Sequence, residues 1–212
     1  FAKYVNDGNT GINAVLTADI TVNTGVLNDS GELNTENSTN LTSWTPIGNY
    51  SKRFSGTFDG QNHTISGLYF NDTGTDYVGL FGYSGGTIKN VGVVDSYFKG
   101  KGRVGGVCGF NDAYNYNGTA TIANCYNTGN VTGNDNNSYV GGVCGYNFVG
   151  TISNCYNRGT VSGSGNCVGG VCGYNFGQIE NCYFDSKVYN GNAVGYNYGT
   201  VYGNVLGKTT KQ

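Results

Sequence analysis

The sequence predicts an all-β fold in which short parallel strands stack into a solenoid. A segment that begins with Val recurs along the chain, with starts at Val78, Val104, Val140, Val168 and Val194 and spacings of 26, 36, 28 and 26 residues. Repeats of about 20 to 50 residues, with short β-rich runs between Gly and Asn, are typical of stacked solenoids. The 212 residues also include 38 Gly, 18 Tyr and only 1 Pro, and such a composition favours strands and turns over helices.

The charge and the apolar patterning exclude several classes of partner. Charged residues make up 11% of the chain and the formal net charge is −2, without any basic run, so nucleic acid binding has no electrostatic support. No stretch reaches the roughly 20 apolar residues of a membrane span. The chain begins at Phe1 without a signal peptide, and we expect it to be part of a larger, processed protein.

The first predicted element is a short helix at the N-terminus. Phe1, Ala2, Tyr4 and Val5 have helical spacing, and the turn at residues 6–8 ends the helix, which we expect to close the open end of the stack. Residues 12–22 are predicted to form the first strands, and residues 30–42 form a polar loop without periodicity. We therefore expect one continuous domain, with the N-terminal cap and first strands in residues 1–53 and the repeats in residues 54–212.

The repeats align into columns of like residues, as parallel strands stacked in register about 4.8 Å apart require. The predicted columns are Ile88, Ile122, Ile152 and Ile179; Asn90, Asn124, Asn154 and Asn181; Val91, Cys125, Cys155 and Cys182; and Tyr97, Val131, Val161 and Val188. We expect the Asn column to form a corner, where Asn adopts a left-handed backbone conformation and hydrogen-bonds its counterpart one rung away.

Alternation along the strand after this corner predicts which side chains face the core. The side chains predicted to point inward are Cys125, Asn127, Gly129 and Val131, and those predicted to point outward are Tyr126 and Thr128. Between Val143 and Cys144 the alternation does not decide which residue faces inward.

The seven cysteines are predicted to be free rather than disulfide-bonded. Cys108, Cys144 and Cys172 share one column and Cys125, Cys155 and Cys182 another, and their places in the first rung are taken by Phe81 and Val91. Stacked neighbours have parallel Cβ vectors, a geometry that a disulfide tolerates poorly. We expect six buried thiols that act as small apolar side chains. Cys167 belongs to no column.

The repeat sequences VGLFGY and VGGVCGYN, followed by T-I-x-N-[VC], resemble the GLUG motif of bacterial surface proteins. Upstream, WTPIG at residues 44–48 and FSGTFDGQNHTISGL at residues 54–68 resemble the segment that precedes such repeats in right-handed parallel β-helix domains. The resemblance implies a right-handed parallel β-helix in a bacterial secreted or cell-wall-anchored protein, with an adhesin-like role. Some related chains resemble immunoglobulin-cleaving peptidases, in which the repeat is not the catalytic part.

Catalytic and metal-binding patterns are weak in this sequence. We see neither a nucleophile with a base nor two carboxylates set to face each other, and we expect a non-enzymatic domain without cofactor or metal. The single histidine, His63, lies in the lead-in segment, without the ligand spacing of a zinc site. Residues 134–137 form an oxygen-rich loop for which calcium binding and a solvated turn are the two alternatives. Nine N-x-S/T sequons, among them that at Asn40, permit glycosylation without indicating it.

The predicted binding surface is a row of outward tyrosines together with an inserted loop. The tyrosines offer apolar faces and hydroxyl groups of the kind that sugars need, or they form a stabilising ladder, and the long rung places its extra residues at 111–118. The candidate ligand-binding residues are Tyr126, Tyr156, Tyr183, Asn111, Asp112, Tyr114 and Tyr116. We expect adhesion to carbohydrate or to a host or matrix protein; the alternatives are a passive spacer that self-associates end to end or packs on other domains of its parent chain, and a glycan-active enzyme.

Overall fold

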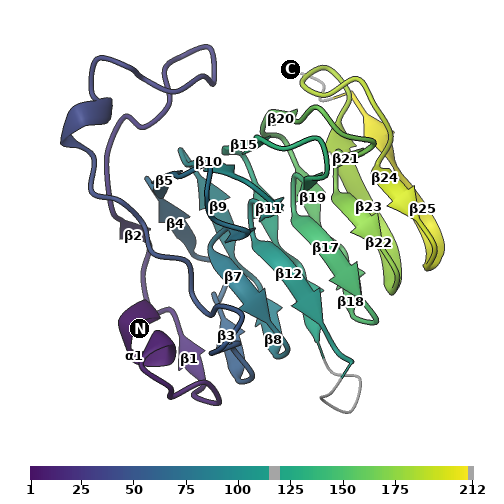
Figure 1. Ribbon diagram of the computed structural model, residues 1–212, viewed down its shortest axis with the longest axis horizontal. Helices are drawn as coiled ribbons and strands as arrows, with labels where there is room; N and C mark the ends of the chain where they lie inside the picture. Colours follow the sequence, from purple (N-terminus) through teal and green to yellow (C-terminus); the bar gives the residue numbers. More distant parts are fainter. Residues whose placement is uncertain (115–119, 210–212) are drawn as a thin grey trace.

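The computed structural model describes residues 1–114 and 120–209 and shows a parallel β-helix (Figure 1). The rungs lie side by side along one axis, from the N-terminal end at the left of Figure 1 to the C-terminal end at the right. Apart from helix α1 (Ala2–Asn6) and the 3-10 helix η1 (Ser38–Asn40), the regular elements in these two ranges are β-strands. The predicted all-β parallel β-helix with a short N-terminal helix is therefore confirmed.

Strands of successive rungs pair in parallel and form sheets that run along the helix axis. The largest sheet has 12 strands in two ladders, which meet at β23 because this strand is long enough to belong to both. The first ladder contains β1 (Ala14–Val15), β3 (Thr57–Asp59), β8 (Thr87–Lys89), β13 (Thr121–Ala123), β18 (Thr151–Ser153), β23 (Gln178–Asp185) and β25 (Thr200–Lys208). The second contains β2 (Ile20–Thr21), β4 (Thr64–Ser66), β9 (Gly92–Val94), β14 (Tyr126–Asn127) and β19 (Tyr156–Asn157).

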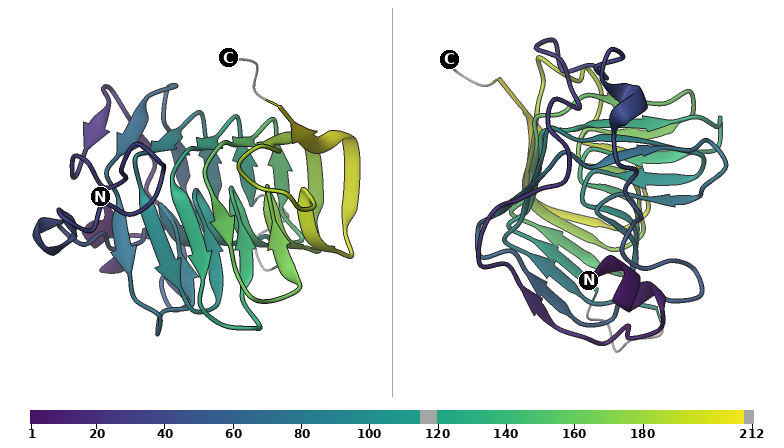
Figure 2. Two further views of the ribbon diagram at one scale, coloured as in Figure 1. Left: turned by 90° about the horizontal axis from the view of Figure 1, so that it is seen from above. Right: turned by 90° about the vertical axis from the view of Figure 1, so that its left-hand side faces the viewer.

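Three smaller sheets complete the rungs and enclose the core with the largest one (Figure 2). One contains β5 (Tyr69–Asn71), β10 (Tyr97–Gly100), β15 (Asn130–Gly133) and β20 (Val161–Ser162). The next contains β6 (Tyr77–Val78), β11 (Arg103–Gly105), β16 (Tyr139–Gly141) and β21 (Cys167–Gly169). The last contains β7 (Phe81–Ser84), β12 (Cys108–Asp112), β17 (Cys144–Phe148), β22 (Cys172–Asn175) and β24 (Val194–Asn197).

Helix α1 packs on the first rung, as the sequence predicts for a cap. Val5 is fully buried, and the ring of Phe1 contacts the rings of Phe54 and Phe58 at centroid distances of 6.0 and 5.8 Å. Gly8, with a φ of 121°, follows the helix at the predicted turn. The polar segment that contains η1 lies outside the stack of rungs, at the N-terminal end (Figure 1).

The predicted core columns are observed in the strand registers. Ile122 pairs with Ile88 and with Ile152, Ile152 pairs with Ile179, and all of them are buried. The inward and outward side chains predicted after the corner are also confirmed. The six cysteines of the two columns are free and buried. Cys167 is also free but only half-buried, and, contrary to the prediction, it belongs to a column, because it pairs in register with Tyr139. Val143 and Cys144, between which alternation did not decide, are both buried.

Three predicted column assignments are wrong. Val131 pairs with Phe98, not with Tyr97, which pairs with Asn130. The cause is one additional residue, Asp95, whose φ of 42° forms a local bend and shifts the strand by one position. The Asp95 carboxylate accepts hydrogen bonds from the backbone amides of Gly25 and Leu27 at 3.1 and 2.8 Å, so a distant segment stabilises the bend.

The other two misassigned residues follow the last complete repeat. Val188 belongs to no strand; its exposed fraction is 40% and its amide closes a turn on the Asp185 carbonyl. Val194 pairs with Cys172 instead of Val168. The reason is that V-G-Y-N at residues 194–197 is equivalent to C-G-Y-N at residues 172–175, not to the V-G-G-V segment that precedes it. The last rung is therefore shorter than the alignment of Val residues predicts.

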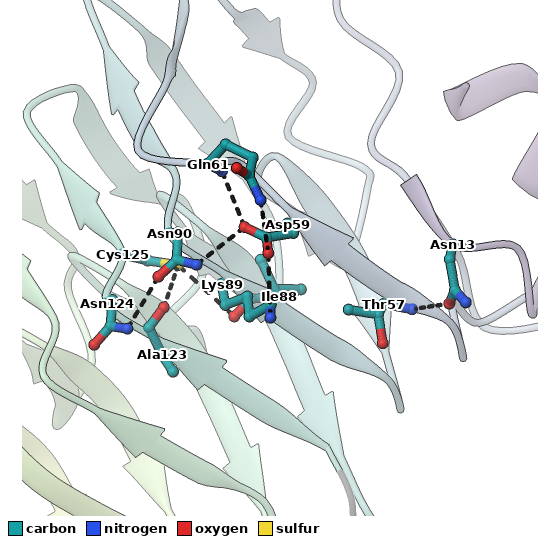
Figure 3. Close-up of polar contacts among 10 residues, drawn as sticks. All are labelled: Asn13, Thr57, Asp59, Gln61, Ile88, Lys89, Asn90, Ala123, Asn124 and Cys125. Carbon is teal, nitrogen blue, oxygen red and sulfur yellow. Dashed lines mark hydrogen bonds and ion pairs between the residues drawn. The ribbon is translucent and has the colours of Figure 1, made fainter. Parts of the chain in front are cut away.

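The asparagine corner is confirmed by its backbone conformation at all four positions, and the predicted side-chain hydrogen bond between rungs is present between Asn124 and Asn90. Asn90, Asn124, Asn154 and Asn181 have φ values of 55, 55, 53 and 49°. Figure 3 shows Asn90 between Asp59 and Asn124: the Asn124 amide donates to the Asn90 carbonyl oxygen, and the Asn90 amide donates to the Asp59 carboxylate, each at 3.0 Å. Lys89 forms an ion pair with the same carboxylate at 3.1 Å.

A second asparagine column runs through the buried core. The Asn111 amide donates to Asn147 Oδ1 at 2.8 Å, the Asn147 amide to Asn175 Oδ1 at 2.9 Å, and the Asn175 amide to Asn197 Oδ1 at 2.8 Å. The Asn147 amide also reaches the Gly150 carbonyl at 3.0 Å, where the strand ends. This ladder satisfies buried carbonyl groups at a turn and fixes the register of successive rungs.

We predict that Asn147→Ala destabilises the fold strongly. The substitution leaves the buried Asn111 amide and the Asn175 carbonyl oxygen with fewer partners, and each unsatisfied buried group costs about 1 to 3 kcal/mol. We expect a loss of at least about 2 kcal/mol in the free energy of unfolding, measured by urea denaturation. The control is Asn136→Ala at an exposed position, where a change within about 0.5 kcal/mol is expected. Equal effects of the two substitutions contradict a stabilising role of the buried ladder.

We also predict a pH-dependent contribution from Asp59. Hydrogen bonds from the Asn90 side chain and the Gln61 amide, together with Lys89, lower the pKa of Asp59 to about 2. Because this folded-state pKa lies below the unfolded value of about 3.9, the contribution is complete above about pH 4 and is lost as the pH falls toward about 2. Asp59→Asn is expected to lower stability by roughly 1 kcal/mol at pH 7 and by almost nothing near pH 2.

The measurement is the free energy of unfolding of both proteins at pH 7, 4 and 2.5, with the exposed Asp29→Asn as a control. A difference between wild type and Asp59→Asn that does not depend on pH contradicts the assignment of the stabilising charge to Asp59.

Candidate functional site

A continuous aromatic surface covers the sheet that contains β7, β12, β17, β22 and β24. Its central row consists of the register-paired residues Tyr83, Phe110, Tyr146, Tyr174 and Tyr196. A second row on the neighbouring sheet consists of Tyr77, Arg103, Tyr139 and Cys167. A third row consists of Phe148, Phe176 and Tyr198. We call these three rows the aromatic face.

The rings of the central row contact one another at short and regular distances. The centroid distances are 4.7 Å from Tyr83 to Phe110, 4.9 Å from Phe110 to Tyr146, 4.8 Å from Tyr146 to Tyr174 and 5.4 Å from Tyr174 to Tyr196. These distances follow from the spacing of the strands, which places one ring above the next. Exposure increases toward the C-terminal end, from 5% for Tyr83 to 43% for Tyr196, and Tyr198 beside it is 64% exposed.

A glycine column turns these rings outward. Cys108 pairs with Cys144, and Phe110 pairs with Tyr146. The intervening glycines, Gly109 and Gly145, do not form a strand pair. A Cβ atom on Gly109 would lie 2.7 Å from the amide nitrogen of Val78, so no larger residue fits there. The glycine breaks the strict alternation, and the cysteine faces the core while the aromatic residue two positions later reaches the surface.

The sequence analysis missed the aromatic face for this reason. Alternation from a buried cysteine assigns the residue two positions on to the core, although every repeat has an aromatic residue at that position. An aromatic residue follows C-G in three repeats, at Phe110, Tyr146 and Tyr174, and this recurrence in the sequence could have revealed the aromatic face.

Arg103 interrupts its row of aromatic residues. It pairs in register with Tyr77 on one side and Tyr139 on the other, and its guanidinium carbon lies 5.4 Å from the centroid of each of these rings and 5.9 Å from that of Phe110. Such distances allow cation–π contacts with all three rings. The nearest carboxylate is that of Asp76, with an Nη1–Oδ2 distance of 3.8 Å.

Asn111 and Asp112 are not surface residues, which corrects the sequence prediction. Both belong to β12 rather than to a loop; Asn111 is fully buried in the asparagine ladder, and the exposed fraction of Asp112 is 5%. The Asp112 carboxylate accepts hydrogen bonds from the hydroxyl of Tyr83 and from Arg53 Nη1, the latter at 3.2 Å. Neither side chain is available to a ligand, because both are buried, and the Asn111 side-chain NH2 group and the Asp112 carboxylate already form hydrogen bonds within the fold.

The remaining residues of the inserted loop are only partly described. Tyr114 is 68% exposed, and its ring contacts that of Phe148 at 5.5 Å, so it extends the aromatic face. Tyr116, the other candidate from this loop, lies outside the described residues.

The predicted row of Tyr126, Tyr156 and Tyr183 is present on a different sheet, and we call it the tyrosine ladder. The rings of Tyr126 and Tyr156 are stacked at 4.9 Å with an interplanar angle of 3°. The ring of Tyr126 lies over Gly92, whose missing side chain leaves room for it, and Lys208 Nζ lies 3.7 Å from the ring centroid of Tyr183. The ring faces of Tyr126 and Tyr183 thus contact other parts of the chain, whereas Tyr156 is 39% exposed. The stacking of Tyr126 on Tyr156 is the geometry of a stabilising ladder.

The electrostatics of the aromatic face favour neutral hydroxyl groups. Burial raises the pKa of Tyr146 to about 12, and both burial and the Asp112 hydrogen bond raise the pKa of Tyr83. These hydroxyls therefore stay protonated near neutral pH and act as hydrogen-bond donors.

The predicted oxygen-rich loop at residues 134–137 lies beside basic side chains. Asp135 Oδ1 accepts a hydrogen bond from the Asn137 amide at 2.9 Å, which forms a local turn. The loop shares a pocket with Asp76, Lys101 and Arg103, and the two positive charges offset the carboxylates of Asp76 and Asp135, which disfavours a calcium ion. Over residues 1–114 and 120–209, His, Cys, Asp and Glu side chains nowhere form the group of three that a metal site requires. The same ranges contain no helix of the length and apolarity that a bilayer crossing requires.

Comparison with known proteins identifies the repeats. Residues 100–132, 136–162 and 164–189 match the family described as the GLUG motif, in agreement with the resemblance seen in the sequence. The three matches contain the middle rungs of the central and second rows, whereas Tyr77, Tyr83 and Tyr196 lie outside them. The matched part of the chain therefore consists of GLUG-motif repeats.

Two relatives share parts of the sequence. One is "Halomucin" of Haloquadratum walsbyi, which is 37% identical over 105 residues, or 47% of this chain and 1% of halomucin. The other is a protein of Evansella cellulosilytica named "Putative Gly-rich membrane protein", which is 36% identical over 61 residues, or 28% of this chain and 7% of that protein. The chain thus spans only a small part of either relative.

A solved structure shares the fold. The crystal structure of "a putative immunoglobulin A1 protease" from Bacteroides ovatus superimposes with a TM-score of 0.60 over 97% of this chain and 80% of that chain, at 20% sequence identity. At this identity the similarity concerns the fold alone.

Proposed function

We propose that this chain is a repeat domain of a cell-surface or secreted protein and that it binds carbohydrate through the aromatic face. The observation that supports binding is the extent of this face, which continues over successive rungs and includes the exposed rings of Phe176, Tyr196 and Tyr198. Contiguous exposed apolar surfaces of this kind mark interaction sites in soluble proteins. The GLUG repeats and the two relatives favour a non-enzymatic surface protein.

Carbohydrate suits the chemistry of the aromatic face better than an apolar partner does. Sugar rings have apolar C–H faces that pack on aromatic rings and hydroxyl groups that exchange hydrogen bonds with tyrosine hydroxyls. The face presents both groups together, because phenylalanine rings lie beside tyrosines on it, as Phe110 does beside Tyr146 and Phe176 beside Tyr198. The carboxylates next to it are engaged within the fold, since Asp112 binds Tyr83 and Arg53.

The arrangement of the face favours a linear polysaccharide over a single sugar. The three rows run along the helix axis, with ring spacings in the central row between 4.7 and 5.4 Å. Successive sugar units of an extended chain that lies along the axis meet an equivalent ring on each rung. Affinity then increases with the number of sugar units, until the chain covers the length of the face.

We predict that the 212-residue chain binds linear glycans on an array that carries glycans and matrix proteins. We expect a variant with both Tyr174→Ser and Tyr196→Ser to bind these glycans at least tenfold more weakly. Both rings lie in the more exposed half of the central row. A tenfold loss corresponds to about 1.4 kcal/mol, which is within the range of two lost ring contacts. The matched control changes Tyr126 and Tyr156 of the tyrosine ladder to Ser.

The array has three informative outcomes. Loss of binding in the aromatic-face variant alone supports the proposal. Loss of binding in the tyrosine-ladder variant alone indicates that the binding site is the row of Tyr126, Tyr156 and Tyr183 and contradicts the proposal. Binding to matrix proteins without any glycan binding contradicts the carbohydrate assignment, provided that circular dichroism shows both variants to be folded.

A second candidate function is a spacer that stacks end to end, and the two ends of the β-helix favour it. β25 pairs on one side with β23, and Val201, Tyr202 and Leu206 of this strand are exposed by 40 to 50%. The N-terminal end has an apolar pocket of about 300 Å³ lined by Phe1, Leu16, Ile20, Trp44, Ile47 and Phe58, among others. An apolar strand at one end and an apolar pocket at the other allow one copy to stack on the next.

If the ends stack, we predict a mass that increases with concentration in multi-angle light scattering and an increase that Val201→Asp abolishes. The charge would be buried in the contact without a partner. The control is Val188→Asp, at a residue of equal exposure (40%, compared with 41% for Val201) that belongs to no strand. A constant monomer mass up to high concentration contradicts the spacer hypothesis in its self-associating form.

A further inference from the structure

We infer that the carbohydrate ligand is acidic and that Arg103 binds its carboxylate group. The inference rests on the proposed function and specifies its ligand. Charged side chains are rare in this chain, at 11% of the residues, and Arg103 is the one described residue of the aromatic face with an ionised side chain. An aromatic residue at this position would continue the ring contacts of the row, so the arginine is not explained by packing within the row.

The surrounding residues hold the Arg103 guanidinium without satisfying it. Tyr77, Phe110 and Tyr139 contact it through their ring faces, which orient the group and leave its N–H donors in the plane of the guanidinium free to point elsewhere. The ion pair with Asp76, at 3.8 Å, is longer than the roughly 3 Å of a hydrogen bond. Within the described ranges, the buried Nε atom has no hydrogen-bond partner.

The guanidinium also opens on a pocket. Asp76, Lys101, Gly102, Arg103, Asp135, Asn137 and Tyr139 line this space, which has a volume of about 310 Å³. The side chain of Arg103 is 27% exposed, and because Nε is buried this exposure belongs to its other atoms. The pocket thus adjoins the central row, so that a glycan on the aromatic face can place a substituent into it.

The lining of the pocket matches a uronic acid. A guanidinium binds a carboxylate through two parallel hydrogen bonds, and Lys101 adds a second positive charge to a pocket that also contains the carboxylates of Asp76 and Asp135. The ring of Tyr139 offers a face for the sugar, and the side chains of Asn137 and Asp135 provide groups that bind hydroxyls. A neutral sugar uses the ring and the hydroxyl contacts but leaves the arginine without a partner.

The test compares the binding of oligogalacturonate, a linear uronic acid polymer, with the binding of the same oligomer after reduction of its carboxyl groups. Isothermal titration calorimetry of the 212-residue chain at low ionic strength gives both affinities. We expect the acidic oligomer to bind at least tenfold more tightly, and we expect Arg103→Gln to bring the ratio of the two affinities close to one. Arg158→Gln, at an exposed arginine beside the tyrosine ladder, is the control for loss of charge.

Arg103→Lys separates charge from geometry. Because lysine keeps the charge but cannot form the two parallel hydrogen bonds, we expect an intermediate preference. Equal affinities of wild type for the acidic and the reduced oligomer overturn the inference and leave the proposed carbohydrate binding intact. If Arg158→Gln reduces the preference as much as Arg103→Gln does, the attraction is a general charge effect and the inference is also wrong. Binding of neither oligomer, when neutral glycans bind on the array, overturns the inference alone; no binding to any glycan overturns the proposed function with it.

Discussion

In-register parallel pairing is the constraint on which the rest of this structure depends. Each strand satisfies its backbone groups by pairing with the equivalent strand of the next rung, so each side chain lies about 4.8 Å from its own counterpart. A residue type is favoured only if it packs well on a copy of itself. Ile122 and its neighbours do so by apolar contact, Asn147 by donating to one amide and accepting from another, and Tyr126 by ring stacking.

The same constraint makes charges costly and therefore informative. Like charges on neighbouring rungs repel each other, and this chain accordingly has few charged residues, in positions that do not repeat. Asp59 ends the asparagine corner by accepting from Asn90, and Asp95 fixes a bend by binding the backbone near Gly25. Arg103 has no comparable contact, since its nearest carboxylate lies 3.8 Å away. A charge that is held by ring faces and a long ion pair, without a close carboxylate partner, is a reasonable place to look for a ligand.

The sequence predicted the columns that follow from regular alternation and missed the features that depend on contacts in the folded chain. The Ile and Cys columns and the left-handed Asn90 corner follow from the repeat, because identical residues in register leave little choice. The shift from Tyr97 to Phe98 depends on one additional residue, which contacts a segment some 70 positions earlier, beyond the reach of a local pattern. The aromatic face was missed because the packing of Gly109 against the Val78 backbone breaks the alternation, and this close approach exists only in the folded chain.

Repetition and exception have different consequences for binding. The central row places an aromatic ring on each rung, with exposure that increases toward the C-terminal end, so by itself it does not bind a polysaccharide at one defined position along the axis. Arg103 occurs on one rung only, between Tyr77 and Tyr139, and a carboxylate that binds there fixes one sugar unit at one position. The aromatic rows then determine how strongly a chain binds, and the single arginine determines where along the β-helix it binds. Such a division follows directly from a fold whose rungs must resemble one another, because only the residues that differ between rungs can distinguish one position from the next.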